Sequence, residues 1–250
     1  MTADLPRGER LEHELHHAEV LLASPEEIWG WGTPAGMARA RRRGRLIVEA
    51  GSMGPGTRTL EVGCGTGLFT QLVSQCGASI EACELSEKLL ERARGRTYGG
   101  PVTFVAGDAT DLSGRQRESY DVVWGSSVLH HLDLDPFLAA ALALLKPGGR
   151  LVFAEPNMLN PQVLAERKIG WLRKARGVSP DETAFVRFGL KRVLERHGFA
   201  EVSILPHEFL HPAIPERLLS AGQLVTSLLE KVPLLREMAG SLLICARKPE

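Results

Sequence analysis

The chain has 250 residues, which is enough for one large domain, or for a core domain with a cap, with a substantial buried interior. Its 30 basic residues equal its 30 acidic residues, and this zero net charge argues against binding nucleic acid through the general field of the protein. Because no apolar run approaches the roughly 18 residues of a membrane span and the first residues lack the apolar segment of a secretory signal, we expect a cytoplasmic protein without a membrane span.

Residues 1–57 are predicted to form a helical cap. Leu11–Leu22 has the pattern of a helix, and a turn follows it. The next segment sets Trp29 and Trp31 among three glycines, which predicts an aromatic loop on a flexible backbone. These tryptophans could line a binding site, or they could anchor the N-terminal helix to the core.

A second N-terminal helix carries five arginines between positions 39 and 45. Helical spacing places Arg39, Arg42 and Arg43 on one face and Arg41 and Arg45 on another. We interpret most of them as a solvated face, although one of them could reach a carboxylate of a bound ligand.

Thr59–Phe69 predicts a buried strand, a tight turn with glycines at positions 63, 65 and 67, and the start of a helix. Glycine is needed in such a turn because the chain bends sharply and a ligand approaches bare backbone. The spacing is Gly-x-Gly-x-Gly, whereas the nicotinamide-binding fingerprint would place its third glycine at Leu68. An acidic residue, Glu61, precedes the first glycine by two positions. The segment therefore predicts a ligand-binding turn of a different class.

Four later strands end at residues that could bind a ligand, namely Glu84, Asp108, Gly125 with Ser126, and Glu155. A carboxylate such as Glu84 can accept both hydroxyls of a ribose through charge-assisted hydrogen bonds. Alternatively, Glu84 complements the dipole of a helix over Ser86–Arg94, and Asp108 is a turn residue or a helix N-cap.

Strands alternate with helices along the chain from residue 58, which predicts an α/β fold with a doubly wound, mostly parallel sheet of seven strands over residues 58–250. A helix from about Glu182 to His197 should end at Gly198 in a left-handed conformation. In such sheets ligands bind outside the carboxyl ends of the strands, near the point where the strand order reverses.

A helical insertion is predicted over about residues 206–240, before the last strand. Apolar residues recur there at helical spacing after Pro215, and Pro233 should end or kink the helix. This helix could roof a hydrophobic pocket, form the seam of a homodimer, touch a membrane surface or pack onto the sheet. Its few basic residues make the membrane the weakest of these alternatives.

The glycine turn and the three strand ends that follow it resemble the motifs of the class I S-adenosylmethionine (SAM)-dependent methyltransferases. The resemblance covers about residues 58–157. It implies that Glu84 binds the ribose of SAM, that Asp108 receives the adenine amino group, and that the amide of Ala109 meets the ring. The cofactor-binding set that it implies is Glu61, Gly63, Cys64, Gly65, Gly67, Glu84, Leu85, Asp108, Ala109, Gly125 and Ser126.

The resemblance also implies a general base at His130 or His131, which follow the fourth strand where an acceptor should lie. Histidine titrates near neutrality, so its neutral, basic form is available. Sugar O-methyltransferases of natural-product pathways look similar here, with a histidine pair and then an acid at the end of the fifth strand, where Glu155 stands. Because Leu-His-His-Leu is widespread in the family, a structural or substrate-positioning role for the histidines is the alternative.

Substrate contacts are expected from the N-terminal segment, which often folds over the cofactor in this family, and from the loops after the later strands. The predicted residues are Trp29, Trp31, Asn157, His207 and His211. Asn157 could equally serve a turn, and each of these two histidines could be an ordinary loop residue. No metal is expected, because the cysteines at positions 64, 76, 83 and 245 and the helically spaced His13, His16 and His17 lack partners at metal-ligand spacing.

The acceptor is expected to be a small and fairly hydrophobic molecule that is methylated at oxygen rather than at nitrogen or carbon. The Asn/Asp-Pro-Pro-Tyr/Phe motif of base-amino methyltransferases is absent after the fourth strand, where Gly-Ser-Ser-Val occupies residues 125–128. Two alternatives are a protein or nucleic-acid methyltransferase that docks through Arg39–Arg45, and a SAM-binding module without catalysis.

Overall fold

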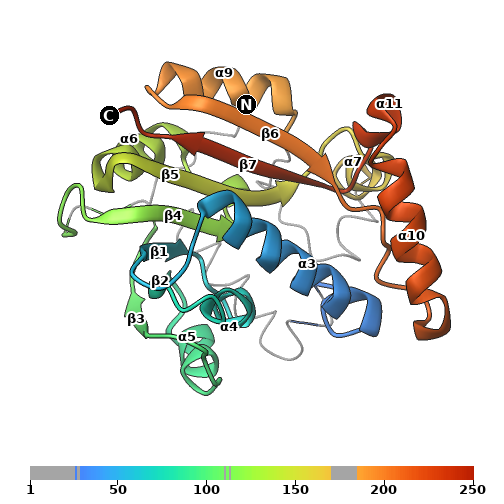
Figure 1. The fold of residues 1–250 in the computed structure, drawn as a ribbon, viewed down its shortest axis with the longest axis horizontal. Helices are drawn as coiled ribbons and strands as arrows, with labels where there is room; N and C mark the ends of the chain where they lie inside the picture. Colours follow the sequence, from blue (N-terminus) through green and yellow to red (C-terminus); the bar gives the residue numbers. More distant parts are fainter. Residues whose placement is uncertain (1–25, 27–28, 110, 113, 170–184) are drawn as a thin grey trace.

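The computed structural model describes residues 26, 29–109, 111–112, 114–169 and 185–250. They contain a seven-stranded sheet with the strand order β3-β2-β1-β4-β5-β7-β6 (Figure 1). Neighbouring strands run parallel, except that β7 is antiparallel to both β5 and β6. The expected doubly wound, mostly parallel sheet is thus confirmed. The strands are β1 (Arg58–Val62), β2 (Ser79–Glu84), β3 (Val102–Ala106), β4 (Tyr120–Ser126), β5 (Leu145–Pro156), β6 (Ala200–His207) and β7 (Ser241–Arg247).

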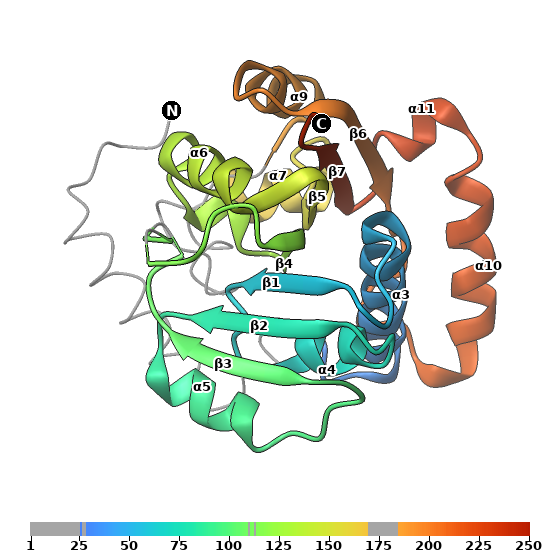
Figure 2. The same ribbon diagram turned by 60° about the vertical axis from the view of Figure 1, so that its left-hand side comes forward.

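Helices cover both faces of the sheet (Figures 1 and 2). The helices are α3 (Pro34–Gly51), α4 (Leu68–Ser74), α5 (Glu87–Arg94), α6 (Leu134–Leu144), α7 (Pro161–Lys168), α9 (Arg187–Arg196), α10 (Leu219–Leu229) and α11 (Pro233–Arg236), with single 3₁₀ turns η1 (Leu129–His131) and η2 (Glu216–Leu218).

The alternation of side chains along β4 shows how the two layers are divided. Val122 and Trp124 pack in a buried cluster with side chains of α3, α4 and α5. Val123, between them, belongs to a second cluster with side chains of α6 and α9. Successive strand residues point to opposite faces, so a central strand that is apolar throughout stabilises both layers. Burial of each such large side chain contributes about 1.5–3 kcal/mol.

Local sequence signals account for several helix ends. Thr33 accepts a hydrogen bond from the amide of Gly36 and Pro34 begins α3, while Ser86 caps α5 by accepting from the amide of Leu89. Gly198, after α9, has a φ of 90°. Only glycine adopts this left-handed conformation without strain, so the predicted end of that helix is confirmed.

The insertion before β7 differs from the expectation in detail. β6 extends to His207, so the insertion begins one or two residues later than predicted, and Pro233 starts the short helix α11 after α10 has ended. The helix α10 does not pack onto the sheet. Thr226 is its one buried residue, and Leu224, Val225 and Leu228 are more than half exposed. Instead, α10 lies beside α3 (Figures 1 and 2), where Arg42 of α3 donates two hydrogen bonds to Glu230.

Some predictions concern residues outside the described ranges. The helix over Leu11–Leu22 lies there, as do His13, His16 and His17. Among the described residues, no group of three metal-ligating side chains is close enough to hold an ion, and all four cysteines are free thiols. No helix in the described part of the chain has the length and apolarity that crossing a bilayer requires.

Candidate functional site

A cavity of about 510 Å³ opens at the carboxyl ends of the strands. The strand order reverses between β1 and β4, and the turns after these two strands both line the cavity. This is the position at which doubly wound sheets bind ligands. The connections after β2, β3, β5 and β6 contribute further walls, together with the segment before α3 and one face of α3.

The glycine turn after β1 has a backbone that other residues would strain. Gly63, Gly65 and Gly67 have φ values of 67°, 53° and 77°. A Cβ on Gly63 would lie 2.3 Å from Cγ2 of Val128, and one on Gly67 would lie 2.5 Å from the hydroxyl of Tyr98. Gly65 is different, because its nearest neighbour would be the ring of Trp29 at 3.5 Å on the wall of the cavity. Gly63 and Gly67 therefore allow close packing, and Gly65 leaves space in the cavity.

Glu84 connects the ends of β1 and β2. Its carboxylate accepts hydrogen bonds from the amide of Gly65, at 2.9 Å, and from the amide of Ser86, at 3.0 Å. A carboxylate offers further lone pairs beyond these two bonds, so Glu84 can still accept hydroxyl groups of a ligand. Leu85, Asp108 and Ala109 line the same part of the cavity.

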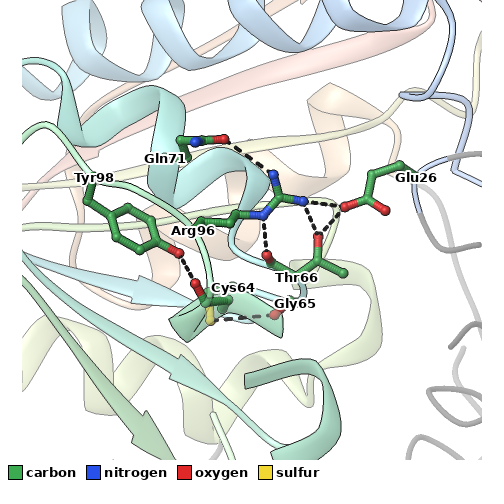
Figure 3. A network of polar contacts seen from close by, with 8 residues as sticks. Glu26, Cys64, Gly65, Thr66, Gln71, Arg96 and Tyr98 are labelled. Carbon is green, nitrogen blue, oxygen red and sulfur yellow. Dashed lines mark hydrogen bonds and ion pairs between the residues drawn. The ribbon is translucent and has the colours of Figure 1, made fainter. Parts of the chain in front are cut away.

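A polar network fixes the outer side of the glycine turn (Figure 3). Arg96 donates from Nε to the carbonyl oxygen of Thr66 at 2.6 Å and from Nη1 to Oε1 of Gln71 at 3.2 Å. Its Nη2 forms an ion pair with Glu26, and the hydroxyl of Thr66 donates to the same carboxylate at 2.8 Å. One guanidinium thus holds together the turn, α4 and the segment that precedes α3.

His130 and Glu155 form a buried pair at the end of β5. Nδ1 of His130 lies 2.6 Å from Oε2 of Glu155, and Oε1 accepts the amides of Val128 and Leu129 at 3.0 and 2.8 Å. Burial alone would raise the pKa of Glu155, but His130 and the two amides outweigh it and hold the pKa below its ordinary value. Since the ionised carboxylate only accepts hydrogen bonds, Nδ1 carries the proton, and Nε2 is the ring nitrogen that the neutral tautomer keeps unprotonated.

Arg43 lines the cavity and connects the end of β4 to the start of β7. It donates hydrogen bonds to the hydroxyls of Ser126 at 3.1 Å, Ser127 at 2.9 Å and Ser241 at 2.7 Å. Burial, and secondarily the neighbouring Arg39, lowers the pKa of Arg43 to about 10, so the guanidinium remains charged at neutral pH. Arg43 also lies over the ring of Trp31, which packs edge-on against Phe69 of α4.

Most of the predicted site residues line this one cavity. They are Trp29, Trp31, Gly63, Cys64, Gly65, Glu84, Leu85, Asp108, Ala109, Ser126, His130, His131 and His211. Trp31 also matches the alternative of an anchoring residue, because it packs on the core. Six predicted residues are outside the lining, namely Glu61, Gly67, Gly125, Glu155, Asn157 and His207.

The residues outside the lining have identifiable positions. Glu61 is buried, and burial raises its pKa to about 8. A Cβ on Gly125 would lie 2.7 Å from both Phe153 and Val128, so Gly125 leaves room for packing. The side chain of Asn157 donates to the carbonyl oxygens of Glu237 and Ala239, which matches the turn role rather than a substrate contact.

His207 is buried, and neither of its ring nitrogens has a hydrogen-bond partner among the described residues. Burial, followed by the charges of nearby arginines, lowers its pKa well below the ordinary value. His207 is therefore neutral and lies behind the wall of the cavity rather than on it.

The prediction of a solvated arginine face was wrong for one side of α3. Arg41 and Arg45 are exposed, but Arg39 and Arg43 line the cavity and Arg42 is paired with Glu230. Sequence reasoning also missed Ser127, whose φ of 56° is unusual for a residue other than glycine. The shared helical face of Arg39 and Arg43 was the available signal, but it does not reveal which face the sheet covers.

Comparisons with known proteins agree with this geometry. Residues 60–153 match the family model described as a methyltransferase domain. A ubiquinone biosynthesis O-methyltransferase of Bordetella avium is 37% identical over 116 residues, which are 45% of this chain and 47% of that protein. The chain spans about half the length of the curated relatives it matches.

Solved structures match over more of the chain. A SAM-dependent methyltransferase from Mesorhizobium loti is 26% identical, with a TM-score of 0.55, over 77% of this chain and 91% of that one. The N-methyltransferase NodS from Bradyrhizobium japonicum, solved with S-adenosyl-L-homocysteine, is 18% identical, with a TM-score of 0.61, over 94% of this chain and 98% of that one. At this identity, the similarity to NodS shows a shared fold and nothing about function. With the family match over β1 to β5 and the glycine turn at the reversal point, residues 60–153 form a methyltransferase domain of the class I SAM-dependent type.

Proposed function

We propose that this protein transfers the methyl group of SAM to a hydroxyl oxygen of a small, fairly hydrophobic molecule, and that His130 is the general base. The observation that carries the proposal is the buried His130–Glu155 pair on the wall of a cavity that also contains the glycine turn and Glu84. A module that only binds SAM has no need of such a pair. The names of the curated relatives, which include O-methyltransferases of ubiquinone biosynthesis, support oxygen as the acceptor atom.

The residues present fit the cofactor. Gly65 leaves space where a side chain would enter the cavity, and Glu84 can accept the hydroxyls of a ribose. Asp108 and Ala109 line the adjacent wall, where we expect the adenine. Bound SAM would supply a methyl group that is electrophilic because it is attached to a sulfonium. The protein then has to position the acceptor and to remove its proton.

His130 can perform the second task. Glu155 orients the ring and stabilises the positive charge that develops when Nε2 takes a proton. General base catalysis of this kind contributes roughly 10²–10⁴-fold to a rate. Trp31, Phe69, Val128 and Leu132 give the cavity an apolar wall that suits a hydrophobic acceptor. Orientation of the two reactants can contribute a further 7–11 kcal/mol, roughly.

A macromolecular acceptor is less well supported. Its predicted docking surface was Arg39–Arg45, but Arg42 is bound to Glu230 and Arg43 is buried, so two exposed arginines remain on this helix. A cytoplasmic location and a homodimer stay predictions.

The test combines binding with product analysis. Titration calorimetry should show that SAM and S-adenosyl-L-homocysteine bind to the wild-type protein, and that Glu84→Ala weakens both by at least about tenfold. Glu87→Ala is the matched control, because Glu87 lies three residues after Glu84 at the exposed start of α5. This variant should bind both ligands like the wild type.

SAM with a labelled methyl group would then be incubated with panels of phenols, other alcohols and amines, and separately with protein and RNA fractions. Label on oxygen of a small molecule is the expected result. Label on protein or RNA would replace the proposal with the macromolecular alternative, and cofactor binding without transfer to any acceptor would favour the binding module.

A further inference from the structure

Arg39 lines the cavity and has a buried N–H donor without an acceptor among the described residues. Its Nε is buried and has no hydrogen-bond partner in the described part of the chain. Burial lowers the pKa of Arg39, and this effect outweighs the opposing influence of Glu208 and Glu166. A buried guanidinium without its full set of hydrogen bonds destabilises a protein. A ligand that accepts a hydrogen bond from Nε would remove this cost.

The neighbouring Arg43 provides an internal comparison. It lies on the same helix face, one turn later, and three serine hydroxyls accept its hydrogen bonds. Both guanidinium groups lie over the ring of Trp31, at 5.2 Å for Arg39 and 4.9 Å for Arg43. The ring attracts each cation without using any of the five N–H donors that a guanidinium carries. Arg43 therefore has a structural role, whereas Nε of Arg39 is a donor that a ligand could use.

The two carboxylates near Arg39, those of Glu208 and Glu166, accept hydrogen bonds from other groups. Glu208 is within 3.5 Å of Arg42 and accepts the amide of Leu210 at 2.9 Å, and Glu166 accepts a hydrogen bond from Gln162. Arg167 lines the same wall. The field of these arginines also acts on the buried His207, whose pKa is lowered first by burial and then by Arg43, Arg42, Arg39 and Arg236.

The position of Arg39 separates it from the residues assigned to the cofactor. Its charged neighbours Glu166 and Glu208 belong to α7 and to the segment after β6, which follow β5 and β6 in the chain. Glu84 and Asp108 follow β2 and β3, and the sheet places β3 and β6 at opposite edges. The acceptor, rather than the nucleoside part of the cofactor, is the ligand that fits between these later elements.

We propose that Arg39 binds a carboxylate group of the methyl acceptor, so that the acceptor combines an apolar body with an anionic end. The proposal rests on the proposed methyltransferase function. The planar fork of a guanidinium matches both oxygens of a carboxylate, and the apolar walls around Trp31 suit the remainder of the molecule. Binding the acceptor at both ends would fix its hydroxyl relative to His130.

The test uses two probes that differ in charge and hardly in shape, 3,4-dihydroxybenzoate and 3,4-dihydroxybenzamide. Calorimetric titration into the protein saturated with S-adenosyl-L-homocysteine should show that the wild type binds the carboxylate at least about tenfold more tightly than the amide. Arg39→Gln should remove this preference, and Arg39→Lys should keep part of it. The control Arg41→Gln, at an exposed position on the same helix, should retain it in full.

Two further readouts make the result specific. The affinity for S-adenosyl-L-homocysteine should stay within about twofold in Arg39→Gln, and its Tm without ligand should equal or exceed that of the wild type, because a buried unmet donor is removed. Equal affinity of the wild type for the two probes, or no binding of the benzoate, would overturn the proposal. So would a tenfold loss of cofactor affinity in Arg39→Gln, because Arg39 would then hold the carboxylate of the cofactor.

The cofactor titration of the wild type tests the proposed function separately. If S-adenosyl-L-homocysteine does not bind, the methyltransferase assignment fails, and the probes are titrated into the ligand-free protein. A charge preference that depends on Arg39 would then still establish the anion site.

Discussion

Nδ1 of His130 and Oε2 of Glu155 are 2.6 Å apart, and both side chains are buried. This pair determines which nitrogen of the imidazole is basic. Glu155→Gln preserves the size of the side chain but replaces a pure acceptor with a group that can also donate. The amide can then donate to Nδ1, and Nε2 becomes the protonated nitrogen, which cannot act as a base.

We therefore expect Glu155→Gln to lower kcat roughly 10²–10⁴-fold while the Kd for SAM stays unchanged. Steady-state assays with labelled SAM would measure the first, and calorimetry the second. His131→Ala is the comparison, and it should lower kcat less than His130→Ala, because Glu155 orients the ring of His130. Equal losses for the two histidine variants would remove the special role of His130.

Glu61 should make the protein less stable at alkaline pH. Burial raises its folded pKa to about 8, whereas an unfolded carboxyl titrates near its ordinary value of 4.5. The folded protein thus binds this proton more tightly, so its stability decreases as pH rises from about 4.5 through 8. Glu61→Gln removes this dependence and should stabilise the protein at pH 9 by an amount on the order of a few kcal/mol.

Denaturant unfolding of the wild type and Glu61→Gln between pH 5 and pH 9 would measure this difference. Parallel curves for the two proteins would show that Glu61 is not protonated in the folded state at neutral pH.

Two glycine substitutions in the same turn should have different consequences. Gly63→Ala places a Cβ 2.3 Å from Val128 and should destabilise the fold by about 1–3 kcal/mol. Gly65→Ala has the more open surroundings, and its Cβ enters the cavity beside Trp29. It should therefore weaken SAM binding at least about tenfold with a smaller change in stability. Thermal unfolding together with cofactor titration separates the two effects. Equal affinities of Gly65→Ala and the wild type for SAM would show that SAM does not approach Gly65.

Arg96 should support cofactor binding without touching the cofactor. Because Arg96→Met removes the ties to Thr66, Gln71 and Glu26, the glycine turn should lose its fixed conformation. We expect a loss of SAM affinity of about tenfold, equivalent to about 1.4 kcal/mol. Arg94→Met is the control, since Arg94 is exposed and pairs with Glu87. Hydrogen exchange of the turn amides would detect the loosening directly, and slow exchange in Arg96→Met would contradict this role.

The parts of the site that could be predicted are those fixed by the backbone. A glycine turn after a buried strand and acids at strand ends leave little freedom, so residues such as Gly65, Glu84 and Asp108 were expected near one another, and all three line the cavity. The residues that were misjudged depend on how distant elements pack. Arg39 and Arg43 have the helical spacing of a solvated face, and only the docking of α3 on the sheet turns them inward.

The same limit applies to Asn157 and α10. Asn157 has the residue type and the position of a ligand contact, yet carbonyl groups about 80 residues later in the chain take both donors of its amide. The apolar spacing of α10 predicts a buried face, but Leu224 is 62% exposed. Periodicity predicts that a helix has an apolar side; it does not predict what covers that side.

The antiparallel strand β7 also sets an order for assembly during synthesis. β5 and β6 do not pair with each other, because β7 lies between them and pairs with both, and β7 is translated after both. Until Ser241–Arg247 emerges from the ribosome, one edge of β5 stays open and β6 with α9 has no sheet to join. A ribosome that pauses within the preceding helices would hold a five-stranded sheet with an open edge at β5, and such an open edge favours aggregation.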